Sequence, residues 1–247
     1  MRGFIPLISG LLFLMILTAC ISDEKINADT LLEKAMGSHG SENIYGKEIN
    51  FDFRDWSYVL DRDSASYTYT RIKDSIEDKL HSKRGFSRSV NGEKVKLADS
   101  MVTKYSNSLN SVLYFFQLPL VLEDAAVQKE YLGTLSIKEQ KYHTLKVTFR
   151  QEGGGVDFED EFRYWINAET YEIDYLAYSY LTDGGGVRFR EAFRKERLED
   201  ILFQDYRNFK PKEKDIPLDS LPDLFVQGNL QLLSTIENMN ISVETGK

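Results

Sequence analysis

Apolar and polar residues alternate with a period of two through most of residues 142–196, and this pattern limits the possible folds more than any other feature. Such alternation is typical of half-buried β-strands. The connections between the runs are short, so neighbouring strands should be antiparallel and form a meander with one apolar and one charged face. The apolar face is assigned His143, Leu145, Val147, Phe149, Val156, Phe158, Phe162, Tyr164, Ile166, Tyr171, Ile173, Tyr175, Ala177, Val187, Phe189 and Phe193, and the charged face includes Arg163, Arg188, Arg190 and Arg194.

The first half of the chain holds further strand patterns. Residues 49–60 predict one strand, with Phe51 and Phe53 on one side and Arg54, Trp56 and Tyr58 on the other. Residues 65–73, 76–82 and 84–91 predict three more, and Asn91-Gly92 is typical of a hairpin turn. A long antiparallel sheet with one apolar face follows.

Two segments predict helices. Asn27 can cap a helix over residues 27–36, and Gly37 can end it. The second helix, over residues 98–116, has the stronger apolar stripe, which continues until Pro119 stops it. The stripe consists of Ala98, Met101, Val102, Tyr105, Leu109, Val112, Leu113 and Phe116.

These helices are the apolar surfaces available to cover the sheet. We therefore expect an α+β fold in which a curved antiparallel sheet forms an incomplete β-barrel packed on two or three helices. Residues 28–247 should form this half-barrel as a single domain, because no linker-like composition divides them.

The pattern Gly-Gly-Gly-Val-x-Phe occurs twice, at residues 153–158 and 184–189. A duplication or a phosphate-binding loop would be one interpretation. A phosphate-binding loop needs a helix N-terminus after the glycines, whereas strand patterns follow here. Hairpin turns that need positive φ are the simpler explanation.

Residues 1–20 have the features of an export signal. Arg2 precedes the apolar run 11–17, and Leu17-Thr18-Ala19-Cys20 ends it. The segment resembles the signals of bacterial lipoproteins, which implies that residues 1–19 are removed and that Cys20 is lipidated and anchors the chain to a membrane. An ordinary secretory signal with a chance cysteine is the alternative. Cys20 is the single cysteine, and lipidation would consume its sulfur, so we expect the mature domain to have no disulfide and no thiol nucleophile.

The net charge of −8 becomes about −9 without Arg2, which argues against a nucleic-acid partner. After the cysteine, residues 20–27 form an acidic tether that begins Ile21-Ser22-Asp23-Glu24-Lys25. It resembles the acidic signal of surface-exposed Bacteroidetes lipoproteins, although a simple solvated linker explains it equally well. We expect a lipid-anchored protein of the outer membrane, on its periplasmic or cell-surface side.

The order of elements resembles the Lol-type outer-membrane lipoprotein carriers and receptors. The segment Phe162–Ile173 is similar to their strand–turn–strand unit, and Ala35–Gly40 followed by Ile49–Trp56 resembles a group of Bacteroidetes lipoproteins of uncharacterised function. The resemblance implies an open half-barrel with a helical lid that encloses acyl chains. An anchored chain cannot be a soluble shuttle, so a receptor-like or stationary role remains. The candidate membrane-entering loop is Tyr114–Leu122, but core packing explains that segment better.

The polar residues do not form a catalytic pattern. His39, His81 and His143 lie on separate elements without metal-ligand spacing. His39 is a possible polar site, more simply explained as a helix-end residue. The acidic run Asp157, Glu159, Asp160 and Glu161 could provide a carboxylate pair or a calcium site, but a cross-strand charge ladder with Lys146 and Arg150 is simpler. We therefore expect no enzyme, cofactor or metal, with a hydrolase as the remote alternative.

The many aromatic residues, with 14 Tyr and 15 Phe, favour a cavity for a hydrophobic or acylated ligand. The alternative is a packed core in a surface-exposed interaction protein with a protein partner and no small ligand. A cavity of a few hundred Å³ would distinguish the two. The predicted lining consists of Phe51, Phe53, Trp56, Tyr105, Leu109, Leu113, Phe116, Phe149, Phe162, Tyr164, Ile173 and Tyr175.

Overall fold

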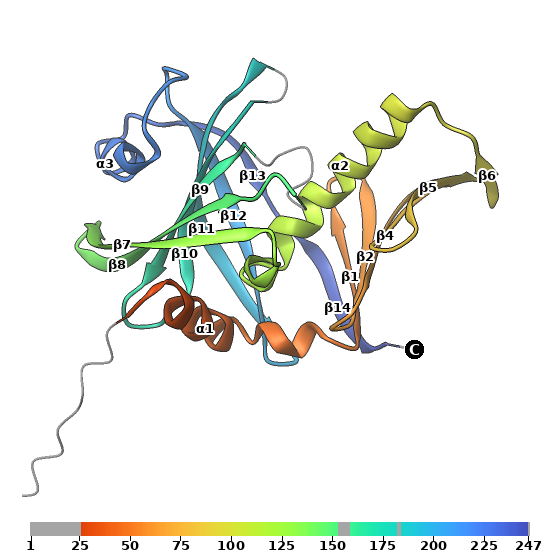
Figure 1. The fold of residues 1–247 in the computed structure, drawn as a ribbon, viewed down its shortest axis with the longest axis horizontal. Coiled ribbons are helices and arrows are strands. Elements are labelled where there is room, and N and C mark those ends of the chain that lie inside the picture. Colours follow the sequence, from red (N-terminus) through yellow and green to blue (C-terminus); the bar gives the residue numbers. More distant parts are fainter. Residues whose placement is uncertain (1–25, 153–158, 182–183, 247) are drawn as a thin grey trace, which may run out of the picture.

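The computed structural model describes residues 26–152, 159–181 and 184–246. Within them, two antiparallel sheets of seven strands each lie on either side of helix α2 (Asp99–Phe116) (Figure 1). The sheets do not close into a barrel across the described residues, and three α-helices pack on them. The predicted α+β architecture with an incomplete barrel is confirmed.

The first sheet has the strand order β14-β1-β2-β3-β4-β5-β6. Residues 49–60, predicted as one strand, instead form a hairpin that turns at Arg54, which has a φ of 57°. The turn at Asn91-Gly92 is present as predicted. The strands are β1 (Lys47–Phe53), β2 (Trp56–Arg62), β3 (Tyr67–Lys73), β4 (Ile76–His81), β5 (Gly85–Val90), β6 (Glu93–Val95) and β14 (Met239–Thr245).

The second sheet has the strand order β13-β12-β11-β10-β9-β8-β7, so the strands β8 to β11 form the meander predicted over residues 142–196, and β7 and β12 extend it on either side. Gly184 and Gly185, just before β11, and Gly186, its first residue, have positive φ, as a hairpin turn favours. Gly153–Gly155 lie outside the described residues. The strands are β7 (Val127–Ile137), β8 (Gln140–Phe149), β9 (Glu161–Asn167), β10 (Ile173–Tyr180), β11 (Gly186–Leu198), β12 (Ile201–Lys210) and β13 (Gln231–Ile236).

The C-terminal segment joins the two sheets. Strand β13 pairs with β12 of the second sheet, and two residues later β14 pairs with β1 of the first. Asn238 lies between them, and its backbone N–H donates to Asp205 Oδ1 at 2.8 Å while its side-chain amide donates to the Gln204 carbonyl at 3.2 Å. The chain therefore passes from one sheet to the other through two residues only, 237 and 238.

Helix α1 (Ala28–His39) begins with the predicted cap and ends later than predicted. The Asn27 side chain accepts from the backbone of Asp29 and Thr30 in a capping box. The helix continues through Gly37 and ends at Gly40, which has a φ of 64°. A Cβ on Gly40 would lie 1.8 Å from the Asp200 carbonyl oxygen, so both the conformation and the close approach require glycine here.

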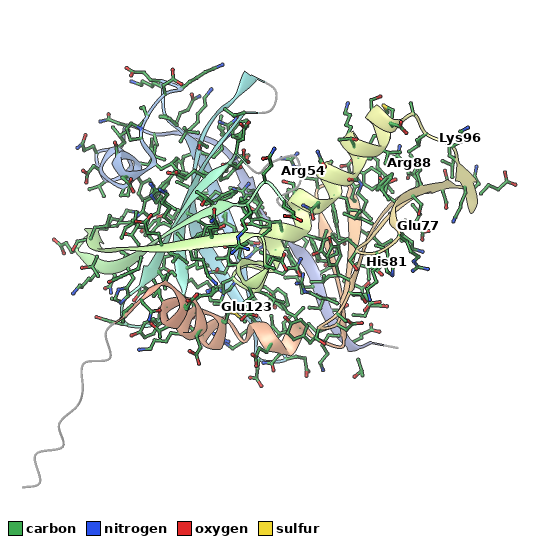
Figure 2. All side chains as sticks on the ribbon, viewed as in Figure 1. Arg54, Glu77, His81, Arg88, Lys96 and Glu123 are labelled. Carbon is green, nitrogen blue, oxygen red and sulfur yellow. The ribbon has the colours of Figure 1, made fainter. Side chains whose placement is uncertain are left out.

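Helix α2 is bound to the first sheet by a buried charged cluster. Asp78 on β4 is fully buried and accepts from Arg71 at 2.8 Å and from Arg88 at 2.6 Å. Arg71 also donates to Ser108 of the helix at 2.9 Å, and Arg88 lies 3.6 Å from the centre of the Tyr105 ring. Figure 2 shows Arg88 on the side of the first sheet, beside the helix.

The chain after α2 turns into the core. Leu118, Leu120, Val121 and Leu122 are buried, the last three in the turn η2 (Leu120–Glu123). The segment Tyr114–Leu122 therefore packs inside the domain, which confirms the core interpretation over a membrane-entering loop.

The outer face of the second sheet is apolar at its centre, which corrects the prediction of a wholly charged face. The short helices η5 (Leu218–Ser220) and α3 (Leu221–Val226) cover it. Asp219 accepts from Arg163 at 2.7 and 3.0 Å and fixes this cover to β9. The cluster beneath comprises Ile137, Tyr142, Trp165, Tyr175, Ala177, Val187, Phe189, Leu218 and Leu221.

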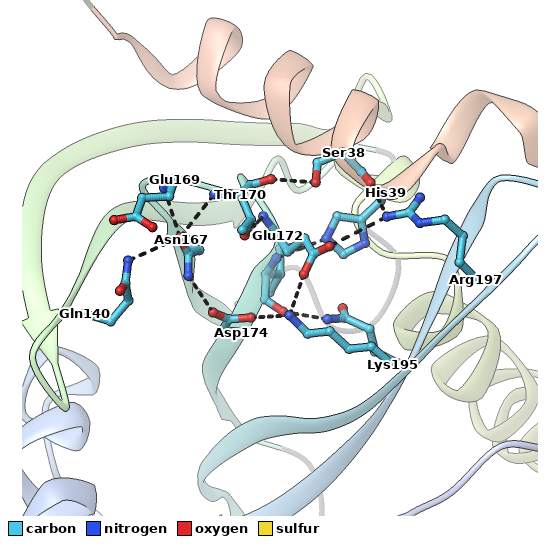
Figure 3. Close-up of polar contacts among 12 residues, drawn as sticks. Ser38, His39, Gln140, Asn167, Glu169, Thr170, Glu172, Asp174, Lys195 and Arg197 are labelled. Atoms are coloured by element: carbon cyan, nitrogen blue, oxygen red, sulfur yellow. Dashed lines mark hydrogen bonds and ion pairs between the residues drawn. The ribbon is translucent and has the colours of Figure 1, made fainter.

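A polar network joins the end of α1 to the β9–β10 hairpin (Figure 3). The buried His39 accepts a hydrogen bond at its Nε2 from the backbone N–H of Ile173 at 3.0 Å. Lys195 donates to both Glu172 and Asp174 at 2.6 Å, and Arg197 donates to the Ser38 carbonyl at 2.9 Å. Burial, with the charges of Lys195 and Arg197, lowers the pKa of His39 to about 3. The neutral imidazole is thus a structural link between helix and sheet.

The Gly40→Ala variant should be strongly destabilised, because the new methyl group would meet the Asp200 backbone. We expect a loss of about 3 kcal/mol or more in the free energy of unfolding, measured by chemical denaturation. Gly46→Ala is the matched control, since Gly46 has a φ of 71° and nothing within 4 Å of an added Cβ. The control should lose only about 1–2 kcal/mol for its left-handed backbone. Equal losses would contradict the proposed clash.

Stability should fall with acidity because His39 stays neutral in the fold. The imidazole pKa is about 6.5 in the unfolded chain and about 3 in the fold, so protons bind the unfolded state first. The contribution of the neutral His39 to the free energy of unfolding is complete above pH 6.5. It should decrease by about 2 kcal/mol between pH 8 and pH 5.

Denaturation curves of the wild type and of His39→Gln at both pH values measure this contribution. The variant should show a pH dependence smaller by that amount. Burial also lowers the pKa of His143, which affects both proteins alike and cancels in the comparison. His81→Gln, on the first sheet, is the control and should keep the pH dependence of the wild type. An identical pH dependence in the wild type and in His39→Gln would overturn the role assigned to His39.

Candidate functional site

A cavity of about 380 Å³ lies between α2 and the inner face of the second sheet. Its walls come from one helix and the ends of four strands, and rings dominate them. The size falls within the range typical of small-molecule sites. The lining residues are Asn110, Ser111, Tyr114, Phe115, Phe149, Asp160, Phe162, Tyr178, Tyr180 and Arg188.

The rings of this cavity contact one another and are fixed in place. Phe162 lies at the centre, 5.3 Å from the Tyr178 ring and 5.8 Å from the Phe149 ring, measured between ring centres. Phe115 of α2 lies 5.3 Å from Tyr178. The Tyr114 hydroxyl lies 3.0 Å from that of Tyr164, which joins the helix to β9. Rings held on regular elements give a preformed apolar surface for a guest.

Two further cavities border α2. One of about 180 Å³ shares Ser111 and Phe115 with the first and lies near the C-terminal strands. Another of about 290 Å³ shares Asn110, Tyr114 and Phe149 with the first and extends towards β3. Together the three spaces follow the helix on several sides.

A hollow of about 430 Å³ beside α1 is less suited to an apolar guest. Its walls carry the acidic residues Glu33, Glu42 and Glu123 together with backbone at two glycines. We therefore assign the candidate site to the aromatic cavities.

The buried hydroxyls beside α2 are neutral. Burial raises the pKa of Tyr114, Tyr164 and Tyr206 well above the usual range and that of Tyr69 to about 12. These groups can donate or accept hydrogen bonds without carrying charge at neutral pH. The site thus offers apolar contact and neutral polar groups.

Strand β11 reverses the orientation that the alternation predicted. Val187 and Phe189 belong to the outer cluster under α3, whereas Arg188 and Arg190 pair with Tyr178 and Leu176 of the inner face. The prediction failed because both faces of this strand are covered, so the apolar residues alone did not identify the interior. The two arginines were therefore missed as cavity residues.

The predicted lining residues divide into several groups. Phe149 and Phe162 line the 380 Å³ cavity, Phe149 also borders the 290 Å³ cavity, and Phe53 and Phe116 line the 180 Å³ cavity. Tyr164 is fully buried behind the wall. The remaining inward residues, Phe51, Leu109, Leu113 and Ile173, fill the core instead.

Three predicted lining residues lie elsewhere. Tyr175 points to the outer face, because a bulge between Ile173 and Tyr175 interrupts the alternation. Trp56 lies under Arg71, whose guanidinium is 4.7 Å from its ring, and Tyr105 contacts Arg88. Both belong to the charged cluster that holds α2.

The remaining candidate residues lie away from the cavities. His39 belongs to the network at the end of α1, and Cys20 lies outside the described residues. Lys146 forms ion pairs with Glu130 and Glu161 at 3.7 Å, which confirms that part of the charge ladder, while Asp157 is among the residues not described. Across the residues described, no group of three or more His, Cys, Asp or Glu side chains could hold a metal ion.

Among the described residues, no helix combines the length and apolar character needed to cross a bilayer.

Three solved structures align with most of this chain. A DUF1329 family protein from Desulfovibrio piger has a TM-score of 0.56 and 10% identity, over 89% of this chain and 94% of that one. An outer membrane lipoprotein-sorting protein domain from Vibrio parahaemolyticus has a TM-score of 0.49 and 8% identity, over 90% of this chain and 95% of that one. A LolA superfamily protein from Nitrosomonas europaea has a TM-score of 0.42 and 9% identity, over 88% of this chain and 93% of that one. The first likeness supports a shared fold, and the other two are too distant to support an argument.

No curated protein matches the sequence. A family model matches residues 9–238, which is nearly the whole chain, and its description is a family of unknown function. The chain therefore belongs to this family of unknown function, DUF6503.

Proposed function

We propose that this chain is a membrane-anchored lipoprotein that binds a hydrophobic or acylated ligand in the cavity between α2 and the second sheet. The observation that carries the proposal is the cavity of about 380 Å³ with a wall of contacting rings. A packed structural core would fill such a space, because protein interiors reach the density of organic crystals. Binding rather than catalysis is the proposed activity.

The neighbouring cavities support a guest longer than the main cavity alone would hold. They share wall residues with it at Phe115 on one side and at Tyr114 on the other. An extended chain could follow α2 from one space to the next and bury apolar surface at about 25 cal/mol per Å².

An interaction protein without a small ligand is the second candidate. Exposed apolar side chains on the C-terminal strands favour it, since Leu232 and Leu233 on β13 and Met239 on β14 are 51%, 39% and 47% exposed. A chain that ignores every apolar probe would support this candidate.

Filling the cavity should abolish binding. Ser111 of α2 lines both the 380 and the 180 Å³ cavities, so Ser111→Trp places an indole in the shared space. We expect at least a tenfold weaker binding of the neutral fluorescent probe N-phenyl-1-naphthylamine, equivalent to about 1.4 kcal/mol.

Ser100→Trp is the matched control, because this exposed serine lies in the first turn of the same helix and lines none of the three cavities. It should bind the probe as the wild type does. The measurement uses protein without residues 1–19 and with Cys20→Ala, which retains every described helix and strand. Absence of probe binding in the unmodified cavity would reject the proposed function.

Membrane attachment should depend on Cys20. In the full-length precursor, Cys20→Ala removes the thiol that would carry the lipid, so the protein should lose its stable membrane attachment. Fractionation of cells, followed by immunoblotting of the membrane and soluble fractions, measures this change. Thr18→Ser, a conservative change two residues before the cysteine, should leave the distribution unaltered. A membrane fraction unchanged by Cys20→Ala would exclude this anchor.

A further inference from the structure

Arg190 on β11 is a buried cation that faces the cavities. Its side chain lies on the inner face, and the residue is only 7% exposed. A guanidinium stays protonated in proteins. Burying such a charge is costly unless an anion pairs with it. A negatively charged partner would therefore stabilise Arg190 at this position.

The described residues provide no carboxylate for Arg190. One terminal nitrogen donates to the Tyr178 hydroxyl at 3.0 Å, and the guanidinium carbon lies 3.7 Å from the centre of the Phe115 ring. The Nε atom is buried and has no hydrogen-bond partner. Neutral hydroxyl and ring contacts orient the guanidinium but leave its charge uncompensated.

The two other buried arginines are paired, which makes Arg190 distinct. Arg71 is 5% exposed and binds Asp78 at 2.8 Å, and Arg163 is 6% exposed and binds Asp219 at 2.7 Å. The first pair joins β3 to β4 and orients Arg71 towards Ser108 of α2, and the second joins β9 to the short helix η5. In the part of the chain that the structure describes, Arg190 alone among these three faces a cavity instead of an acid.

The surroundings of Arg190 divide the site into a polar end and an apolar end. Arg190 lines the 180 Å³ cavity together with Arg54, and its lining includes no acidic residue. Phe115 lies under the guanidinium and also borders the 380 Å³ cavity, where the rings gather. Asp160 is the acid in the lining of that larger cavity. An anion is therefore favoured beside Arg190 and an apolar chain beside Phe162.

We propose that the ligand is an amphipathic anion, with its anionic oxygens on Arg190 and its acyl or alkyl chain in the aromatic cavity. This inference rests on the proposed binding function and adds the charge of the head group. The planar fork of a guanidinium can donate two parallel hydrogen bonds to a carboxylate or a phosphate. Arg54, at the β1–β2 turn, adds positive charge to the same cavity.

The test compares probes of equal chain length and different charge. Hexadecanoate and hexadecyl phosphate, below their critical micelle concentrations, and hexadecanol, below its solubility limit, compete with N-phenyl-1-naphthylamine for the protein lacking residues 1–19. Both anions should displace half of the neutral probe at a concentration at least tenfold lower than the alcohol requires. The tighter of the two anions identifies the head group as a carboxylate or a phosphate.

Arg190→Met separates the charge from the fold. Methionine fills much of the same space without a charge, so the variant should melt at the same or a higher temperature. It should lose at least tenfold in affinity for the anions and keep its affinity for hexadecanol and for the neutral probe. Arg190→Lys, which keeps the charge but loses the fork, should show an intermediate loss.

Arg163→Met is the matched control from the same sheet. It removes an equally buried arginine from the outer face, so it should lower the melting temperature and leave the preference for anions unchanged. Equal affinities for the alcohol and the anions, with the neutral probe still bound, would overturn the anionic head group and leave the proposed function standing. Failure of every probe to bind would reject both.

Discussion

Helix α2 lies between the two sheets and joins them. It contacts the first sheet through buried charged groups and the second through aromatic rings. On the first sheet, the fully buried Asp78 is shared by Arg71 and Arg88, and Arg71 reaches Ser108 of the helix. An ion cluster of this kind is stable only when each charge is paired, and its geometry then fixes the helix in one position. On the second sheet, the contacts are aromatic, with a hydroxyl pair between Tyr114 and Tyr164.

This asymmetry explains why the cavities lie where they do. The charged cluster holds the helix by directional bonds, so the helix does not have to pack tightly against the second sheet. Rings of β8, β9 and β10 remain in contact with one another and leave space towards the helix. The interior thus combines a rigid support with an unfilled apolar surface, which is the combination a binding site requires.

Periodicity predicted most of the strands and both longer helices, because these elements bury one face each. It assigned the wrong face in β11, where α3 covers Val187 and Phe189 and the arginines turn inward. It also misplaced Tyr175, since the bulge beside it has no clear signature in the sequence. Strands β6, β7, β12, β13 and β14 were not predicted at all. Of the cavity, the sequence indicated Phe149 and Phe162 but not Phe115 or Tyr178, whose positions depend on how the helix is fixed against the sheet.

The passage of the C-terminal segment between the sheets has a mechanical consequence. Strands β13 and β14 belong to different ladders, and Asn238 lies at the point of change. The ladders include no pairing between β1 and β12, so the angle between the sheets at this edge is set by the backbone of residues 237–238 and by the Phe116 ring, which packs on Phe51 of β1 and on Phe203 of β12. Asn238 lies in the wall of the 180 Å³ cavity, so the width of this cavity depends on the angle between the two sheets at residues 237–238.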